Sequence, residues 1–429
     1  MPPSVPLVRR SSRAAKRAAT FAADVARATA ARVDRATRST RTARMIAEME
    51  DRAWAFRRER KIGKGTLRAT YVEAYRGYVA EGKAYVRVRV MEEPVFPAAA
   101  TTLPNPALVR ANVRRFFALA FPGVHVRISM GSLLADAITD RHGFATAQVP
   151  AIDLDPGSHD YECTTIPVDA DEPAAHATGQ VLMPDPESRI AVISDVDDTV
   201  LRTGMSEGFV AVRNTLLGTA NTRRAIPGMA ALYRALSSYG EEDARPAFFY
   251  VSTGPWNLYD MLTDFLAIRG FPDGPLFLTD WAPQERYVVR SGQGHKRATI
   301  TRLFSGYPDS AFVLFGDSGQ KDPETYVELA REYPTQVAAI IIRDVGDHMA
   351  DRAAELIETA VELQSEGVPF HFVDDAVDAA AALLELGLLT DDGIKYVRAE
   401  MNANPELEDE PVPNDDTRPD SEVGSGADE

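Results

Sequence analysis

The sequence predicts an α/β protein in which a parallel-sheet domain follows a small antiparallel, sandwich-like β domain. Two observations lead to this fold class. Residues 69–183 contain segments in which apolar and polar residues alternate, as they do in half-buried strands. From residue 190 to about residue 400, short apolar runs alternate with helical segments, which is the order of a parallel sheet with helices on both faces.

The composition is that of a soluble protein with room for two or three domains. The chain has 429 residues, of which 45% are hydrophobic and 26% are charged. No run of about 18 apolar residues predicts a membrane span, and residues 1–10 lack the apolar stretch of a signal peptide. The single cysteine, Cys163, cannot form an internal disulfide. We therefore expect a cytoplasmic protein.

Residues 1–68 form a basic extension that we expect to be helical. They carry 18 Lys and Arg against 6 Asp and Glu, and residues 11–59 contain no Gly or Pro. Such a helix could lie on anionic lipid at the inner face of the membrane, or it could be a solvated extension or dock on the next domain. The whole chain has a net charge of −16, so we expect no nucleic-acid partner.

Residues 69–185 form the predicted β domain. A turn is expected at residues 139–143 and a short helix at residues 108–119. No residue of this domain has the spacing of metal ligands or of a catalytic group. The alternating pattern predicts strands at residues 71–75, 84–90, 124–129 and 143–149.

Residues 186–400 form the predicted parallel-sheet domain, and the acidic, Pro-containing residues 401–429 are expected to be a disordered tail. The apolar runs predict strands at residues 190–193, 248–252, 275–279, 311–315, 337–342 and 370–373. The segments between them predict helices at residues 229–237, 258–268, 296–304 and 323–332.

Polar residues follow three of these strands at the point where each strand ends. Asp195 and Asp197 follow the first strand, Ser252 and Thr253 the second, and Asp317 and Asp322 a later one. The carboxyl ends of parallel strands meet at one edge of the sheet, where open α/β sheets bind ligands. Several close carboxylates repel one another without a cation, and hydroxyl and carboxylate oxygens suit Mg²⁺. The sequence therefore predicts a magnesium site at this edge.

These acids also have other interpretations. A calcium-binding EF-hand loop starting at Asp195 would need Gly and Glu where the chain has Val200 and Ser206, so it is excluded. The metal-binding Asp-x-Asp of a sugar transferase remains open for the first pair alone. A second Gly-Asp pattern, at residues 346–351, does not directly follow its strand, so Asp317 is preferred to Asp347.

The motifs occur in the order found in haloacid-dehalogenase-like phosphohydrolases. They are Asp195-Val-Asp-Asp-Thr199 after a strand, Ser252 after the next strand, Lys296 at a helix start, and Gly316-Asp-Ser-Gly-Gln-Lys-Asp322. The residues around them, Tyr250-Val-Ser-Thr-Gly-Pro-Trp256 among them, resemble the actin-patch-associated, Mg²⁺-dependent phosphatidate phosphatase family. The resemblance covers residues 70–400 and is strongest at residues 189–345.

The resemblance implies a role for each of these residues. Asp195 would be the nucleophile that forms an aspartyl-phosphate, and Asp197 the acid and base. Asp195, Asp317 and the Asp197 carbonyl oxygen would hold Mg²⁺. Asp322 would hold a metal-bound water or orient Lys296.

The remaining roles concern the phosphate. Lys296 would pair with Asp195 and the phosphate, and Ser252 would bind phosphate oxygens together with nearby backbone groups, Thr253 included. Thr199 would support the nucleophile loop, and Arg343 would contact the phosphate or head group.

The function that the resemblance implies is a Mg²⁺-dependent phosphatidate phosphatase acting at a membrane surface and releasing diacylglycerol and phosphate. Two alternatives remain at this point: a phosphatase of a soluble phosphorylated metabolite, and a non-catalytic membrane-surface scaffold. An insertion at residues 203–214, directly after the nucleophile loop, could shape access to the site or pack onto the body of the domain.

Overall fold

The structure is a computed structural model that describes residues 52, 55–61, 63–93, 118–151, 153–167, 173–202, 224–239, 245–279, 292–345 and 350–403. Residues 55–61 are helical, as expected. Most of the predicted amino-terminal helix lies outside the described residues. So do residues 108–117 of the second predicted helix, the insertion at residues 203–214, Asp347 and residues 404–429 of the acidic tail. Residues 118–119 are not helical, and residues 401–403 end a helix, so both predictions were wrong at those positions.

The parallel sheet is confirmed. It has six strands in the order β11-β10-β9-β12-β13-β14, and every neighbouring pair is parallel. All six strands were predicted, with bounds that differ by up to three residues at an end. Their bounds are β9 (Ile190–Asp195), β10 (Ala247–Pro255), β11 (Leu276–Thr279), β12 (Ala311–Asp317), β13 (Val337–Arg343) and β14 (Phe370–Val373).

Helices cover both faces of this sheet because successive residues of its strands point to opposite sides. On β9, Val192 packs in one core cluster and Ile193 in the other. The first face carries α5 (Met229–Ser237), α6 (Tyr259–Arg269), α10 (Ala376–Glu385) and α11 (Asp391–Ala403). The second carries α7 (Gly292–Gly306), α8 (Asp322–Glu332) and α9 (Ala350–Ser365). A short 3-10 helix, η2 (Trp256–Leu258), joins β10 to α6.

The domain that precedes this sheet has eight strands. Seven follow the order β1-β3-β2-β8-β7-β4-β5, and β6 pairs with the other edge of β3. The bounds are β1 (Thr70–Ala74), β2 (Gly77–Ala80), β3 (Lys83–Glu92), β4 (His125–Met130), β5 (Leu133–Ile138), β6 (Phe144–Pro150), β7 (Gly157–Ile166) and β8 (His176–Met183). All pairs are antiparallel except β2 with β8, so the expectation of a wholly antiparallel domain was wrong at that pair.

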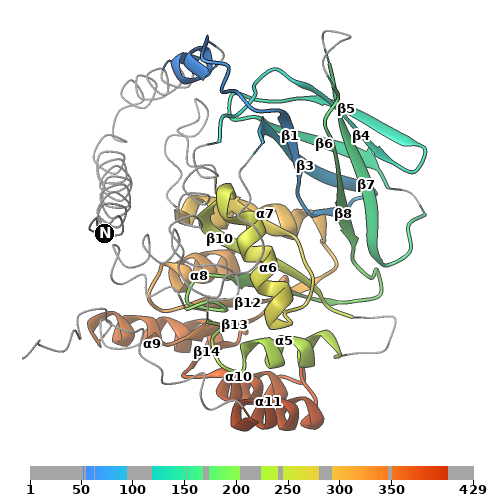
Figure 1. Cartoon of the computed structure of the whole chain (residues 1–429). Coiled ribbons are helices and arrows are strands. Elements are labelled where there is room, and N and C mark those ends of the chain that lie inside the picture. Colours follow the sequence, from blue (N-terminus) through green and yellow to red (C-terminus); the bar gives the residue numbers. More distant parts are fainter. Residues whose placement is uncertain are drawn as a thin grey trace, which may run out of the picture.

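The β domain packs against the parallel-sheet domain, above it in the view of Figure 1. Tyr75 and Phe144 join the core on the first face of the parallel sheet, whereas Tyr78 and Ala80 join the core on the second face. The Tyr307 hydroxyl, which follows α7, donates to the Val79 carbonyl at 2.6 Å. The two domains therefore share buried side chains on both faces of the sheet.

Within the part of the chain that the structure describes, none of the helices is both long enough and apolar enough to cross a lipid bilayer.

Candidate active site

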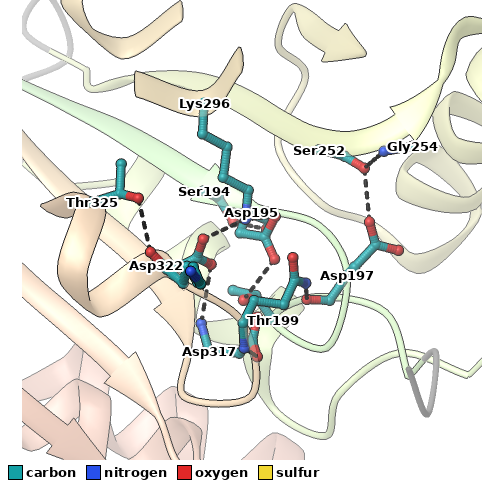
Figure 2. Close-up of polar contacts among 12 residues, drawn as sticks. Ser194, Asp195, Asp197, Thr199, Ser252, Gly254, Lys296, Asp317, Asp322 and Thr325 are labelled. Atoms are coloured by element: carbon teal, nitrogen blue, oxygen red, sulfur yellow. Dashed lines mark hydrogen bonds and ion pairs between the residues drawn. The ribbon is translucent and has the colours of Figure 1, made fainter. Parts of the chain in front are cut away.

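The predicted acids converge at the carboxyl ends of two neighbouring strands. Asp195 ends β9 and Asp317 ends β12, and the two strands pair in parallel. Asp322 begins α8, and Lys296 reaches the same point from α7, as Figure 2 shows. One oxygen from each of the three carboxylates lies within 4.8 Å of the others. Both the acids and the lysine are buried.

Lys296 is the cation of this cluster. Its ammonium Nζ lies 2.7 Å from Asp195 Oδ1 and 2.5 Å from Asp322 Oδ1. Burial alone would lower the pKa of Lys296, but the attraction of the two carboxylates outweighs it and raises that pKa above its ordinary value. The lysine is therefore charged, and it neutralises part of the acidic cluster.

Without a bound cation, full ionisation of the three acids is unfavourable. Burial raises the pKa of Asp195 well above its usual value, and neighbouring acids add to the effect against the attraction of Lys296. Burial, and then Asp322, raise the pKa of Asp317 to about 7. One ammonium group thus faces three carboxylates, a charge imbalance that a bound divalent cation would correct.

Asp317 offers an oxygen suited to such a cation. Its Oδ1 accepts hydrogen bonds from the backbone N–H groups of Gly319 at 2.8 Å and Gln320 at 3.0 Å. Its Oδ2 is buried and has no hydrogen-bond partner among the described residues. Because the first oxygen is held by the backbone, the second has a fixed direction, so the residues present fit a hard cation such as Mg²⁺.

Asp197 and Ser252 form the other side of the site. The Ser252 hydroxyl donates to Asp197 Oδ2 at 2.8 Å and accepts from the Gly254 N–H at 2.9 Å (Figure 2). The Thr253 carbonyl accepts a hydrogen bond of 2.8 Å from the Thr279 hydroxyl on β11. The predicted phosphate-binding segment therefore lies next to Asp197 and is attached to the neighbouring strand.

Thr199 lies where a supporting residue was expected, with its hydroxyl donating to Asp195 Oδ2 over a long 3.4 Å. Gln320, which the sequence analysis did not single out, brings its amide Nε2 within 3.4 Å of the Asp197 carbonyl oxygen. Nothing in the sequence around Gln320 predicts this contact.

Arg343 contacts the turn that follows Asp197. Its Nε and Nη2 donate to the Asp198 carbonyl oxygen at 3.0 and 2.5 Å. Asp198 has a φ of 54°, the left-handed conformation that few residues other than Gly adopt. Its own N–H donates to the Leu201 carbonyl at 2.7 Å. The guanidinium therefore stabilises a tight turn that directly follows Asp197.

The comparisons with known proteins agree with this geometry. Residues 190–344 match the family model described as the catalytic domain of phosphatidate phosphatase APP1. Phosphatidate phosphatase APP1 of Saccharomyces cerevisiae is 31% identical over 164 residues, which cover 38% of this chain and 27% of that protein. An uncharacterized protein of Schizosaccharomyces pombe is 30% identical over 158 residues, 36% of this chain and 25% of that protein. The match thus spans about a quarter of each relative.

Solved structures are more distant. A carbohydrate acetylesterase from Xanthomonas citri covers 67% of this chain and 72% of its own, at 9% identity and a TM-score of 0.22. That score is too low to support any inference. Residues 190–344 of this chain are similar to the catalytic domain of phosphatidate phosphatase APP1, and the yeast relative supports that similarity.

Proposed function

We propose that this protein is a Mg²⁺-dependent phosphatase that hydrolyses phosphate monoesters through an aspartyl-phosphate on Asp195, and that its substrate is phosphatidate. The products would be diacylglycerol and phosphate. The observation that carries the proposal is the buried cluster in which Lys296 pairs with Asp195 and Asp322 beside Asp317. The family match of residues 190–344 supports the same activity.

The cation would be held by Asp195, by Asp317 through Oδ2, and by the carbonyl oxygen of Asp197, with Asp322 contacting it through water. When bound, Mg²⁺ supplies positive charge that reduces the repulsion between an anionic nucleophile and an anionic phosphate. Lys296 supplies the second positive charge, and it also keeps Asp195 oriented.

The chemistry takes two steps. A carboxylate oxygen of Asp195 attacks phosphorus in line, and the bond from phosphorus to the ester oxygen breaks as the new bond forms. Asp197, as the acid, gives its proton to the leaving alkoxide. Asp197 then takes a proton from water as that water attacks phosphorus, and the bond between phosphorus and Asp195 breaks to release phosphate.

Ser252, Thr253 and backbone N–H groups at the end of β10 would bind the phosphate oxygens. In the structure the Ser252 hydroxyl donates a hydrogen bond to Asp197. The phosphate would therefore enter between Asp195 and the end of β10. Arg343 would act through the turn at Asp198.

The proposal extends to architecture and location. We assign the parallel-sheet domain to the haloacid-dehalogenase-like fold and the eight-stranded domain to the sandwich-like class. We place the protein in the cytoplasm, as a peripheral protein that meets its lipid at the membrane surface. The name of the yeast relative is what favours phosphatidate over a soluble phosphate ester, since the site itself selects only for phosphate.

The test compares hydrolysis of phosphatidate in mixed vesicles with hydrolysis of an aryl phosphate and of water-soluble sugar phosphates. We expect Mg²⁺-dependent release of phosphate from the vesicles, abolished by EDTA and by Asp195→Asn. Hydrolysis of the soluble esters but not of phosphatidate would favour a metabolite phosphatase. No hydrolysis of any ester, or an Asp195→Asn protein as active as the wild type, would overturn the proposal and leave the scaffold alternative.

A further inference from the structure

The segment that follows Ser252 is held by the β domain. The last residues of β10 lead directly into η2 and α6, and each of Trp256, Asn257 and Tyr259 contacts a β-domain residue. Nothing in the family match assigns a role to the β domain, since that match begins at residue 190.

Two arginines on β3 reach across the interface. Arg89 Nη1 donates to Asn257 Oδ1 at 2.9 Å, and its Nε donates to the His142 carbonyl at 3.3 Å. The Arg87 guanidinium contacts two rings, at 4.1 Å from the centroid of Phe144 and 4.7 Å from that of Trp256. Alternate residues of a strand share a face, so both arginines point to the parallel-sheet domain.

Tyr75 provides the apolar part of the same contact. It is 1% exposed, and its ring centroid lies 4.5 Å from that of Trp256 and 4.7 Å from that of Tyr259. Its backbone is fixed on both sides, because the Tyr161 hydroxyl donates to the Tyr75 carbonyl and the Arg76 N–H donates to the Tyr259 hydroxyl. Rings packed in this way hold η2 against the β domain.

Only a short stretch of chain separates η2, which contacts the β domain, from Ser252 in the candidate active site. Gly254 donates to the Ser252 hydroxyl, which donates to Asp197. The end of β10 is also held by β11, because the Thr279 hydroxyl donates to the Thr253 and Gly254 carbonyls. After Gly254 the next polar side-chain contact along the chain is the one from Arg89 to Asn257.

We propose that Arg89 is a positioning residue of the β domain, which through Asn257 holds the segment from Ser252 to Gly254 in the conformation that binds phosphate. The β domain thereby completes the phosphate site of the neighbouring domain. The kinetic readout of this inference rests on the proposed function. A second readout, amide hydrogen exchange in the segment that follows Ser252, needs no substrate.

The kinetic test compares Arg89→Ala with Arg127→Ala in the full chain. Arg127 is a matched control because it also lies in the β domain and pairs with Asp136 at 2.8 Å, but on an exposed face. With an aryl phosphate as substrate, we expect Arg89→Ala to raise the KM and the inhibition constant of orthophosphate about tenfold, as for one charge-assisted hydrogen bond. The Mg²⁺ concentration for half-maximal activity should stay unchanged, because the carboxylate cluster is untouched.

Substitutions of the partner residue sharpen this test. Asn257→Leu removes the same hydrogen bond from the side of the other domain, so it should raise the KM and the inhibition constant of orthophosphate as Arg89→Ala does. It serves as the test variant if Arg89→Ala does not fold. Arg89→Lys and Asn257→Asp keep a donor or an acceptor and should recover most of the phosphate affinity. General destabilisation would lower the amount of active protein but would move neither constant. Phosphate constants in Arg89→Ala equal to those in Arg127→Ala would overturn the inference.

Hydrogen exchange separates this inference from the proposed function. We expect the amides of residues 253, 254 and 256–258, Gly254 above all, to exchange faster in Arg89→Ala than in the wild type or in Arg127→Ala. If the wild type hydrolyses no phosphate ester, the proposed function fails, and exchange alone decides: faster exchange sustains the positioning role, and unchanged exchange overturns it.

Discussion

Ser252 on β10 donates a hydrogen bond of 2.8 Å to the carboxylate of Asp197, which follows the neighbouring strand β9. This bond joins the loop that would bind phosphate to the residue that would transfer protons. The two functions are therefore held at a fixed distance before any substrate arrives.

Removing that bond should impair catalysis without unfolding the protein. We expect Ser252→Ala to lower kcat/KM about tenfold to a hundredfold, since a hydrogen bond that positions Asp197 is lost. Steady-state kinetics with an aryl phosphate measures this. Ser188→Ala is a suitable control because the Ser188 hydroxyl donates to the Ile190 carbonyl, at the opposite end of β9. Equal kcat/KM values for the two variants would mean that Ser252 does not act in the reaction.

Lys296→Met should expose the repulsion among the acids. Removing a buried partner leaves uncompensated charge, so we expect the metal-free variant to lose about 3–5 kcal/mol of its free energy of unfolding. Saturating Mg²⁺ should restore part of that loss. Urea denaturation in EDTA and in Mg²⁺ measures both. Lys395→Met, which breaks an exposed pair with Asp392, should leave the free energy of unfolding nearly unchanged because solvent screens that pair. A Lys296→Met protein as stable as the wild type in EDTA would contradict the role of Lys296 as counter-ion.

Mg²⁺ binding should weaken in acid. Burial, then Asp322, raise the pKa of Asp317 to about 7 without metal. The folded protein then holds a proton that the unfolded chain releases near pH 4, so metal-free stability falls as the pH rises from about 4 through about 7.

A cation must displace this proton at about pH 6 but not at about pH 8. We therefore expect a given Mg²⁺ concentration to raise Tm more at the higher pH, as thermal unfolding can measure. Asp317→Asn is the control, and it should remove most of the Mg²⁺ effect at both values. An equal gain in the wild type at both pH values would show that Asp317 does not titrate against the metal.

Arg343→Ala distinguishes the role expected from the sequence from the contact found in the structure. A residue that holds the Asp198 carbonyl should affect kcat, so we expect kcat to fall about tenfold with the inhibition constant of orthophosphate unchanged. Asp198→Gly should remain active because Gly adopts a positive φ without strain. The reverse pattern, weaker phosphate inhibition at constant kcat, would restore Arg343 as a substrate contact.

Local patterns explain which parts of the fold were predictable. The strand β9 and the acids after it could be recognised because a buried parallel strand is a continuous apolar run and charges at its exit have no structural reason. The strand β5 was missed because most of its residues are exposed, and β8 because Gly179 and polar residues interrupt its alternation. Strands of these two kinds are stabilised by pairing with neighbours rather than by a pattern of their own.

The site was predictable where residue type and order carry information. Asp195, Lys296, Asp317 and Asp322 could be grouped because parallel topology brings strand ends together. The contacts of Arg343 with Asp198 and of Arg89 with Asn257 could not, because they join residues 145 and 168 positions apart. Neither partner of such a pair differs in sequence from an ordinary surface residue.

If Asp195 is the nucleophile, the phosphoryl group can be trapped on its carboxylate. Asp197→Asn should still react with an aryl phosphate, whose leaving group needs no proton, but should hydrolyse the intermediate slowly. After acid quenching in Mg²⁺, mass spectrometry should find one phosphoryl group on Asp195, absent when Asp195→Asn is added. A peptide without phosphate, or phosphate on another residue, while the wild type turns over the same substrate, would contradict the mechanism.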